Sequence, residues 1–100
     1  MYIVREIFRA KPGNAGKMAK LMKKAFKSDK SARVMTDMVG PYHTVVIETE
    51  VESLAAWEQT MKDYKAGKPD PNMDEEVMKE MANYNDWYVE GRREIYQIIE

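Results

Sequence analysis

The sequence contains one histidine, His43, and histidine is the side chain best suited to proton transfer near neutral pH. Alternation along a strand would place it on the same face as Val45 and Ile47, which we expect to pack beneath helices. A neutral imidazole there could act as a general base or as a donor that orients a ligand. The interpretation that we favour is a histidine at a strand end, hydrogen bonded to a backbone carbonyl or to water and without a catalytic role.

Aromatic side chains from several segments could line a site for a flat apolar molecule. Such sites combine apolar walls with a few polar groups that fix the orientation of the ligand. The candidate ligand-binding residues are Tyr42, Trp57, Tyr84 and Trp87, with Arg5 and Asp37 joining His43 as polar contacts. The nine methionines suit such a pocket as well, although core filling is their default role.

The composition argues against metal and thiol chemistry. The chain has no cysteine, which excludes disulfides, thiolate metal sites and a cysteine nucleophile. Asp70, Asn72 and Asp74 alternate like the opening of a calcium loop, but Glu75 stands where that loop requires glycine and Met81 where it requires glutamate. We therefore expect no metal and no cofactor, and interpret these residues as helix-capping groups.

The charge balance limits the partners. Sixteen basic and seventeen acidic residues give a net charge of −1, which removes the electrostatic argument for a nucleic-acid partner. No apolar run approaches the roughly 20 residues of a membrane-spanning helix, and charged residues such as Arg5 and Glu6 interrupt any signal-peptide core. We expect a cytoplasmic protein with no membrane partner.

Hydrophobic periodicity and turn residues define the elements that would position these side chains. They predict a strand over 2–10, a helix after Asn14, strands over 32–39 and 42–50 around a Gly40-Pro41 turn, a helix after Ser53, a helix from Asn72, and a strand over 92–99. This order predicts one α+β domain over residues 1–100 with the ferredoxin-like βαββαβ topology, a four-stranded antiparallel sheet with helices on one face.

The second predicted helix should bury one side of its surface. Its apolar residues recur at helical spacing and are Leu54, Trp57, Met61 and Tyr64. We expect this stripe to pack against the sheet.

Both faces of the predicted sheet carry apolar residues. In the first strand Ile3 and Ile7 alternate with Val4 and Phe8, and Val46 opposes its apolar neighbours in the hairpin. Helices can cover only one face, and each large side chain left exposed forgoes roughly 1.5–3 kcal/mol of burial. We therefore expect a homodimer packed sheet to sheet about a twofold axis, in preference to a monomer with ordinary surface apolarity.

In this layout the sequence resembles the dimeric α+β barrel superfamily, in particular small proteins of the NIPSNAP and antibiotic-biosynthesis-monooxygenase types. The resemblance is carried by Lys11-Pro12-Gly13 after the first strand, by residues 40–48 as a central strand, and by residues 53–58 as a helix start. It implies the fold, a dimer, and a pocket between helices and sheet in each protomer. The haem-degrading members use a histidine, an asparagine and a tryptophan that find no matches here.

Three interpretations of function remain open. The first is a homodimer that binds a small apolar or aromatic compound in a cleft between helices and sheet. The second is a cofactor-independent monooxygenase-like enzyme with His43 as the base. The third is a structural or regulatory dimer without a ligand, because a fold does not by itself supply a reaction.

Overall fold

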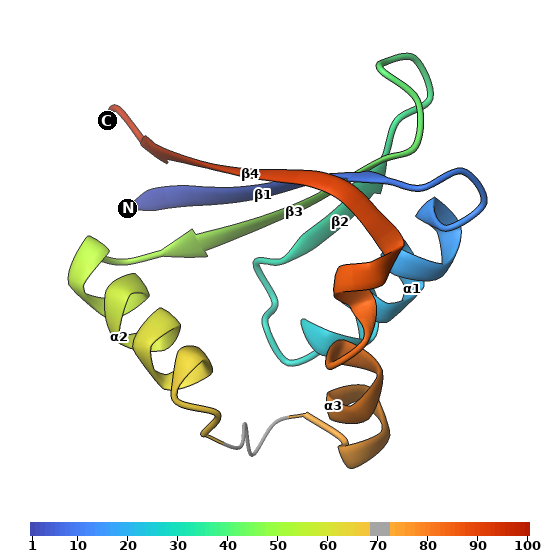
Figure 1. Cartoon of the computed structure of the whole chain (residues 1–100). Helices are drawn as coiled ribbons and strands as arrows, with labels where there is room; N and C mark the ends of the chain where they lie inside the picture. The colour runs from blue at the N-terminus through green and yellow to red at the C-terminus, as the bar shows by residue number, and fades with distance from the viewer. Residues whose placement is uncertain (69–72) are drawn as a thin grey trace.

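The structure is a computed structural model that describes residues 1–68 and 73–100. Its elements are β1 (Tyr2–Ala10), α1 (Ala15–Ala25), β2 (Arg33–Thr36), β3 (Thr44–Val51), α2 (Leu54–Lys65), α3 (Glu75–Met81), a 3₁₀ helix (Tyr84–Trp87) and β4 (Tyr88–Gln97). The strands form one antiparallel sheet in the order β2-β3-β1-β4, and the helices lie on one side of it (Figure 1). The predicted ferredoxin-like α+β topology is confirmed.

The core lies between the helix-covered face of the sheet and α1. Met18 and Met22 of α1 pack against Val45 and Ile47 of β3, and all four are almost fully buried. The sequence places these residues at the spacings that turn one helical stripe and one strand face inward. On the other side of α1, Leu21 packs with Val77 of α3, so α1 joins the sheet to α3.

Helix α2 begins as the sequence predicts but buries less than expected. The Ser53 Oγ accepts a hydrogen bond of 3.1 Å from the Ala56 backbone N–H, which caps the helix. No residue of α2 is buried, and Leu54 and Tyr64 are exposed. The prediction of a fully packed apolar stripe is wrong, because α2 lies under one end of the sheet, away from α1 and α3 (Figure 1).

The hairpin and the last strand differ from the predicted boundaries. Strand β2 ends at Thr36, and β3 begins at Thr44, so a loop over 37–43 replaces a short turn at Gly40-Pro41. Strand β4 begins at Tyr88, several residues earlier than predicted, because its pairing with β1 reaches Ala10.

The acidic segment before α3 is described only in part. Asp74 occupies the N-cap position of α3, and its side chain makes no capping hydrogen bond. Asp70 and Asn72, the other proposed capping groups, lie outside the described residues. Over the parts of the chain that the structure describes, no helix is long and apolar enough to cross a membrane.

Candidate functional site

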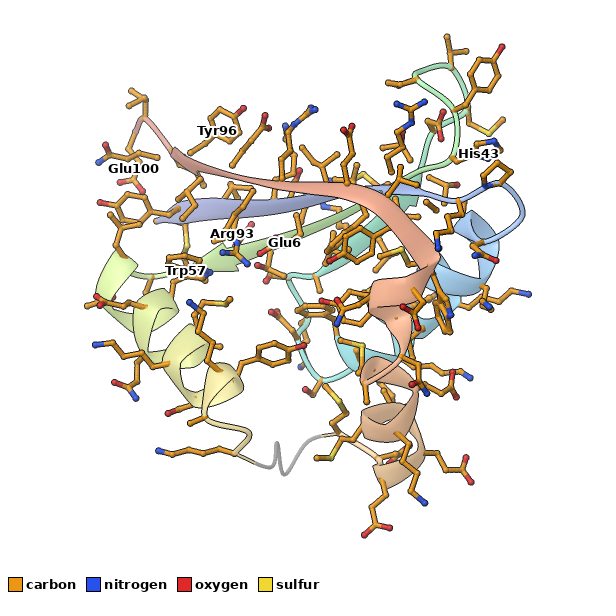
Figure 2. All side chains as sticks on the ribbon, viewed as in Figure 1. Glu6, His43, Trp57, Arg93, Tyr96 and Glu100 are labelled. Atoms are coloured by element: carbon orange, nitrogen blue, oxygen red, sulfur yellow. The ribbon has the colours of Figure 1, made fainter. Side chains whose placement is uncertain are left out.

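An ion pair between a half-buried carboxylate and a more exposed guanidinium lies on the helix-covered face of the sheet. Glu6 of β1 and Arg93 of β4 are direct partners across the two strands, and the Arg93 guanidinium is paired with the Glu6 carboxylate. The same guanidinium lies over the Trp57 ring of α2, 5.1 Å from its centroid. Figure 2 shows Trp57 directed from α2 toward this pair. A cation, an anion and an aromatic surface therefore meet between α2 and the sheet.

Aromatic residues extend this group toward α3. Tyr84 meets the Phe8 ring edge to face at 6.0 Å, and Phe8 also lies 4.8 Å from the Tyr88 ring. Burial raises the pKa of Tyr84 above the ordinary tyrosine value, and the neighbouring Tyr64 and Glu6 add to the rise. Tyr84 thus keeps its proton at neutral pH and remains a hydrogen-bond donor.

We call this set of side chains the inner cluster: Glu6, Trp57, Tyr64, Tyr84 and Arg93. It draws on β1, α2, β4 and the 3₁₀ helix, and its members contact or electrostatically perturb one another. It offers a guanidinium, a carboxylate, phenolic hydroxyls and flat apolar walls. Apolar walls with a few polar groups are typical of sites that bind a small aromatic molecule carrying a hydrogen-bonding group.

The inner cluster contains two of the predicted ligand-binding residues, Trp57 and Tyr84. Trp87 lies elsewhere, with the Lys17 ammonium 4.1 Å above its ring. Arg5 lies on the opposite face of the sheet, where its guanidinium is 2.9 Å from the carboxylate of Glu48.

Asp37 and Tyr42 belong to the loop over 37–43. The Asp37 carboxylate accepts hydrogen bonds from the backbone N–H of Tyr42 at 3.0 Å and of Thr44 at 2.9 Å. Asp37 therefore organises the loop backbone, and its carboxylate is directed at the chain rather than toward the inner cluster.

His43 is not placed where the alternation predicted. Both Tyr42 and His43 have left-handed backbones, with φ of 66° and 54°, and His43 is exposed. The prediction that His43 packs beneath the helices is wrong, because the left-handed turn interrupts the strand alternation before Thr44. Figure 2 shows His43 beside the loop, away from Trp57, Glu6 and Arg93. A role for His43 as a base stays a prediction.

The left-handed backbone at His43 yields a stability prediction. A left-handed conformation costs a residue with a Cβ roughly 1–2 kcal/mol, which glycine avoids, although glycine loses about 0.4–1 kcal/mol through the unfolded chain. We expect His43→Gly to raise the free energy of unfolding by about 0.5–1 kcal/mol in urea denaturation. His43→Ala keeps the Cβ and should show no such gain; equal effects of the two changes would contradict this explanation.

The face of the sheet away from the helices carries a shallow hollow of about 690 Å³. We call this face the outer face. Its middle row is apolar across Met35, Val46 and Ile7 on adjacent strands and ends at Arg92 of β4. Charged residues flank the row in equal numbers of each sign: the arginines are Arg5, Arg9, Arg33 and Arg92, and the glutamates are Glu48, Glu50, Glu90 and Glu94.

Lateral ion pairs neutralise much of this charge within the sheet. Arg5 lies between Glu48 and Glu94, at 2.9 and 3.9 Å, and Arg92 lies 3.4 Å from Glu94. The outer face is therefore mixed in composition but balanced in charge. Within residues 1–68 and 73–100, no group of three or more histidine or acidic side chains is arranged to hold a metal ion.

Sequence reasoning missed Glu6 and Arg93. Glu6 lies between Val4 and Phe8 on the inward face of β1, and a charged residue at a core-facing position signals a buried pair or a site. Its partner is 87 residues away in sequence, and only the strand pairing identifies it.

Comparison with solved structures agrees with this description of the fold. A protein from Agrobacterium tumefaciens, Atu4242, is 14% identical with a TM-score of 0.73, and the match covers 97% of this chain and 92% of that one. An uncharacterised NIPSNAP domain protein from Burkholderia xenovorans is 12% identical with a TM-score of 0.69, covering 99% and 95%. A proposed antibiotic biosynthesis monooxygenase from Nitrosomonas europaea is 13% identical with a TM-score of 0.66, covering 100% of both chains.

No protein-family model and no curated protein matches the sequence. At these identities the similarity concerns the fold. The chain has the ferredoxin-like α+β fold of NIPSNAP family proteins and antibiotic-biosynthesis-monooxygenase-like proteins, as the resemblance in its sequence predicted.

Proposed function

We propose that this protein is a homodimer in which each protomer binds a small aromatic compound at the inner cluster. The observation that carries the ligand is the ion pair of the half-buried Glu6 with the more exposed Arg93, set against the half-buried ring of Trp57 on a helix that buries none of its own residues. Polar groups held among aromatic side chains are typical of small-molecule sites.

The loose packing of α2 supports access to this site. Trp57 and Met61 are half-buried, whereas Leu54 and Tyr64 are exposed. A helix that contributes so little to the core can move aside at low cost, which would admit a ligand between α2 and the sheet. In the proposed complex, the ring of the ligand stacks on Trp57 while Tyr84 donates a hydrogen bond to its polar group.

The outer face supports the homodimer. It combines an uncovered apolar row with equal numbers of arginines and glutamates, of which Arg5, Arg92, Glu48 and Glu94 are paired laterally. A second copy of the face can therefore cover it without burying a net charge. A twofold axis would place the same row of each protomer against its counterpart.

The two tryptophans provide a matched test of the ligand site. We choose 1-naphthol as the probe, because it combines a flat apolar ring system with one hydroxyl, and expect calorimetric titration to detect binding to the wild-type protein. Trp57→Ala should raise the Kd at least about tenfold through the loss of an aromatic contact. Trp87→Ala changes a half-buried tryptophan that packs against the core, with the Lys17 ammonium over its ring. It should lower the stability of the protein and leave the Kd of the folded protein unchanged.

A thermal-shift measurement on the wild-type protein gives a second test of the ligand site. A bound ligand should also raise the melting temperature of the wild-type protein, since a ligand at 100 times its Kd adds about 2.7 kcal/mol to stability. If neither 1-naphthol nor a broad panel of phenols and aromatic acids produces a shift, the protein is a dimer without this ligand site. If Trp87→Ala weakens binding as much as Trp57→Ala, the site lies elsewhere.

A further inference from the structure

The loop over 37–43 carries the most exposed apolar side chains of the hairpin. Val39 is 99% exposed and Met38 95% exposed, and Tyr42 is also largely exposed. The loop rises above the sheet on the side away from the helices, beside the outer face (Figure 1). These side chains bury little of their surface within their own protomer.

The backbone of this loop is nevertheless supported by contacts within the loop. Asp37 accepts two backbone hydrogen bonds, and Gly40 approaches so closely that an added Cβ would lie 3.2 Å from the Asp37 Cβ. The loop also contains the consecutive left-handed residues Tyr42 and His43. Non-glycine residues with a left-handed backbone are found more often at functional sites, and this loop presents Met38 and Val39 to solvent.

A second apolar patch lies at the opposite corner of the sheet. It comprises Tyr96, Ile98 and Ile99 at the end of β4, all exposed, with Ile99 86% exposed. Strand β4 is the edge opposite to β2, and its residue Gln97 pairs with Tyr2, at the far end of β1 from the loop. Figure 2 shows Tyr96 above the sheet, on the outer face. The loop and this patch are thus diagonal to each other on one side of the molecule.

From this arrangement we infer that, in the proposed homodimer, the loop over 37–43 of each protomer packs against residues 96–99 of the partner subunit. The inference rests on the proposed homodimer and specifies how its two copies are oriented. A twofold axis in the plane between the sheets, perpendicular to the line that joins the two patches, exchanges them. One rotation then covers both loops and both strand ends.

The area and charge of the outer face favour a second copy as the occupant. Four strands spaced about 4.8 Å apart, with about eight residues of roughly 3.3 Å each, project an area of roughly 500 Å². A standard interface covers about 800 Å² on each partner, so the sheet face alone is small and the two patches enlarge it at its corners. The face between the patches carries as many arginines as glutamates, so it can meet its own copy without net repulsion.

The absence of cysteine from the sequence allows a direct proximity test. We would prepare Val39→Cys, Ile99→Cys and the double variant, confirm that each is a dimer by light scattering, and treat each with a short thiol-specific bismaleimide. The double variant is expected to form covalent dimers in high yield. Each single variant is expected to remain uncross-linked, because identical positions lie at distant corners in this orientation. A mixture of the two single variants, with one chain tagged, should give a heterodimer.

The outcomes separate this inference from the proposed homodimer. Efficient cross-linking of Val39→Cys alone would mean that the two loops meet each other, and would overturn the inference while leaving the dimer intact. Dimers that fail to cross-link in every combination would overturn it as well. A wild-type protein that is monomeric by light scattering would instead overturn the proposed homodimer.

An affinity measurement complements the cross-linking. The double change Met38→Ser and Val39→Ser removes two apolar contacts at each of two equivalent sites, and should raise the dimer Kd by about 100-fold or more in analytical ultracentrifugation. Leu54→Ser changes an exposed leucine on the helix-covered side and serves as the control, with no change in Kd. An unchanged Kd for the loop variant would also contradict the inference.

Discussion

Replacement of Ile7 by lysine is expected to convert the dimer into a monomer. Ile7 lies in the middle of the outer face, paired with Val46 on one side and Arg92 on the other. In the proposed dimer, a lysine there would lose its hydration and add an unpaired positive charge to each protomer, which costs several kcal/mol per ion. We expect the dimer Kd to rise by about a thousandfold or more, measured by analytical ultracentrifugation.

The control for this prediction places the same charge elsewhere. Ala55 is exposed on α2, on the helix-covered side of the sheet, so Ala55→Lys should leave the Kd unchanged. Far-ultraviolet circular dichroism would establish that the Ile7→Lys chain remains folded. A folded Ile7→Lys variant that still sediments as a dimer would show that the outer face is not the interface.

The second large effect concerns the core. Leu21 is 1% exposed and joins α1 to Val77 of α3, whereas Leu54 is 48% exposed on α2. Leu21→Ala leaves a cavity between two helices and should lower the free energy of unfolding by about 2–5 kcal/mol. For a small domain this is a large part of a total stability of about 5–15 kcal/mol.

Leu54→Ala removes the same atoms from an exposed position. We expect a loss below about 1 kcal/mol, because little apolar area returns to water. Urea denaturation of both variants, each in the Ile7→Lys background so that dissociation does not contribute, would give the comparison. Equal losses would mean that α2 is packed more tightly than its exposure indicates.

The sequence was sufficient to predict the fold because its local signals agree with one another. Alternation in β3 separates Val45 and Ile47 from Val46, and the helical spacing of Met18 and Met22 places them against that inner face. Ser53 also caps α2 as its type predicts. Each of these signals depends on neighbours within a few residues, which is the range over which sequence patterns are informative.

The position of His43 illustrates what the pattern could not supply. Alternation assumes an extended backbone, whereas Asp37 binds the N–H groups of Tyr42 and Thr44 and holds the intervening residues in a left-handed turn. A side chain that caps backbone groups five and seven residues away leaves no periodic signature. The loop therefore interrupts the predicted strand at His43, the only histidine of the sequence.

The inner cluster depends on contacts that are distant in sequence. Trp57 and Tyr84 are identifiable as large aromatic residues, but their association follows from the pairing of Glu6 with Arg93 across β1 and β4. The low burial of α2 likewise depends on how the whole helix packs against the sheet. Its apolar spacing alone predicted burial that Leu54 and Tyr64 do not have.

Light scattering of the wild-type protein at micromolar concentration determines whether the outer face pairs two copies of the chain. The uncovered apolar row of the outer face, with its balanced charges, predicts a particle of twice the 11.7 kDa mass of one chain. A particle of 11.7 kDa that persists as the concentration is raised to the millimolar range would contradict the proposed homodimer. It would mean that Met35, Val46 and Ile7 face solvent in the native protein.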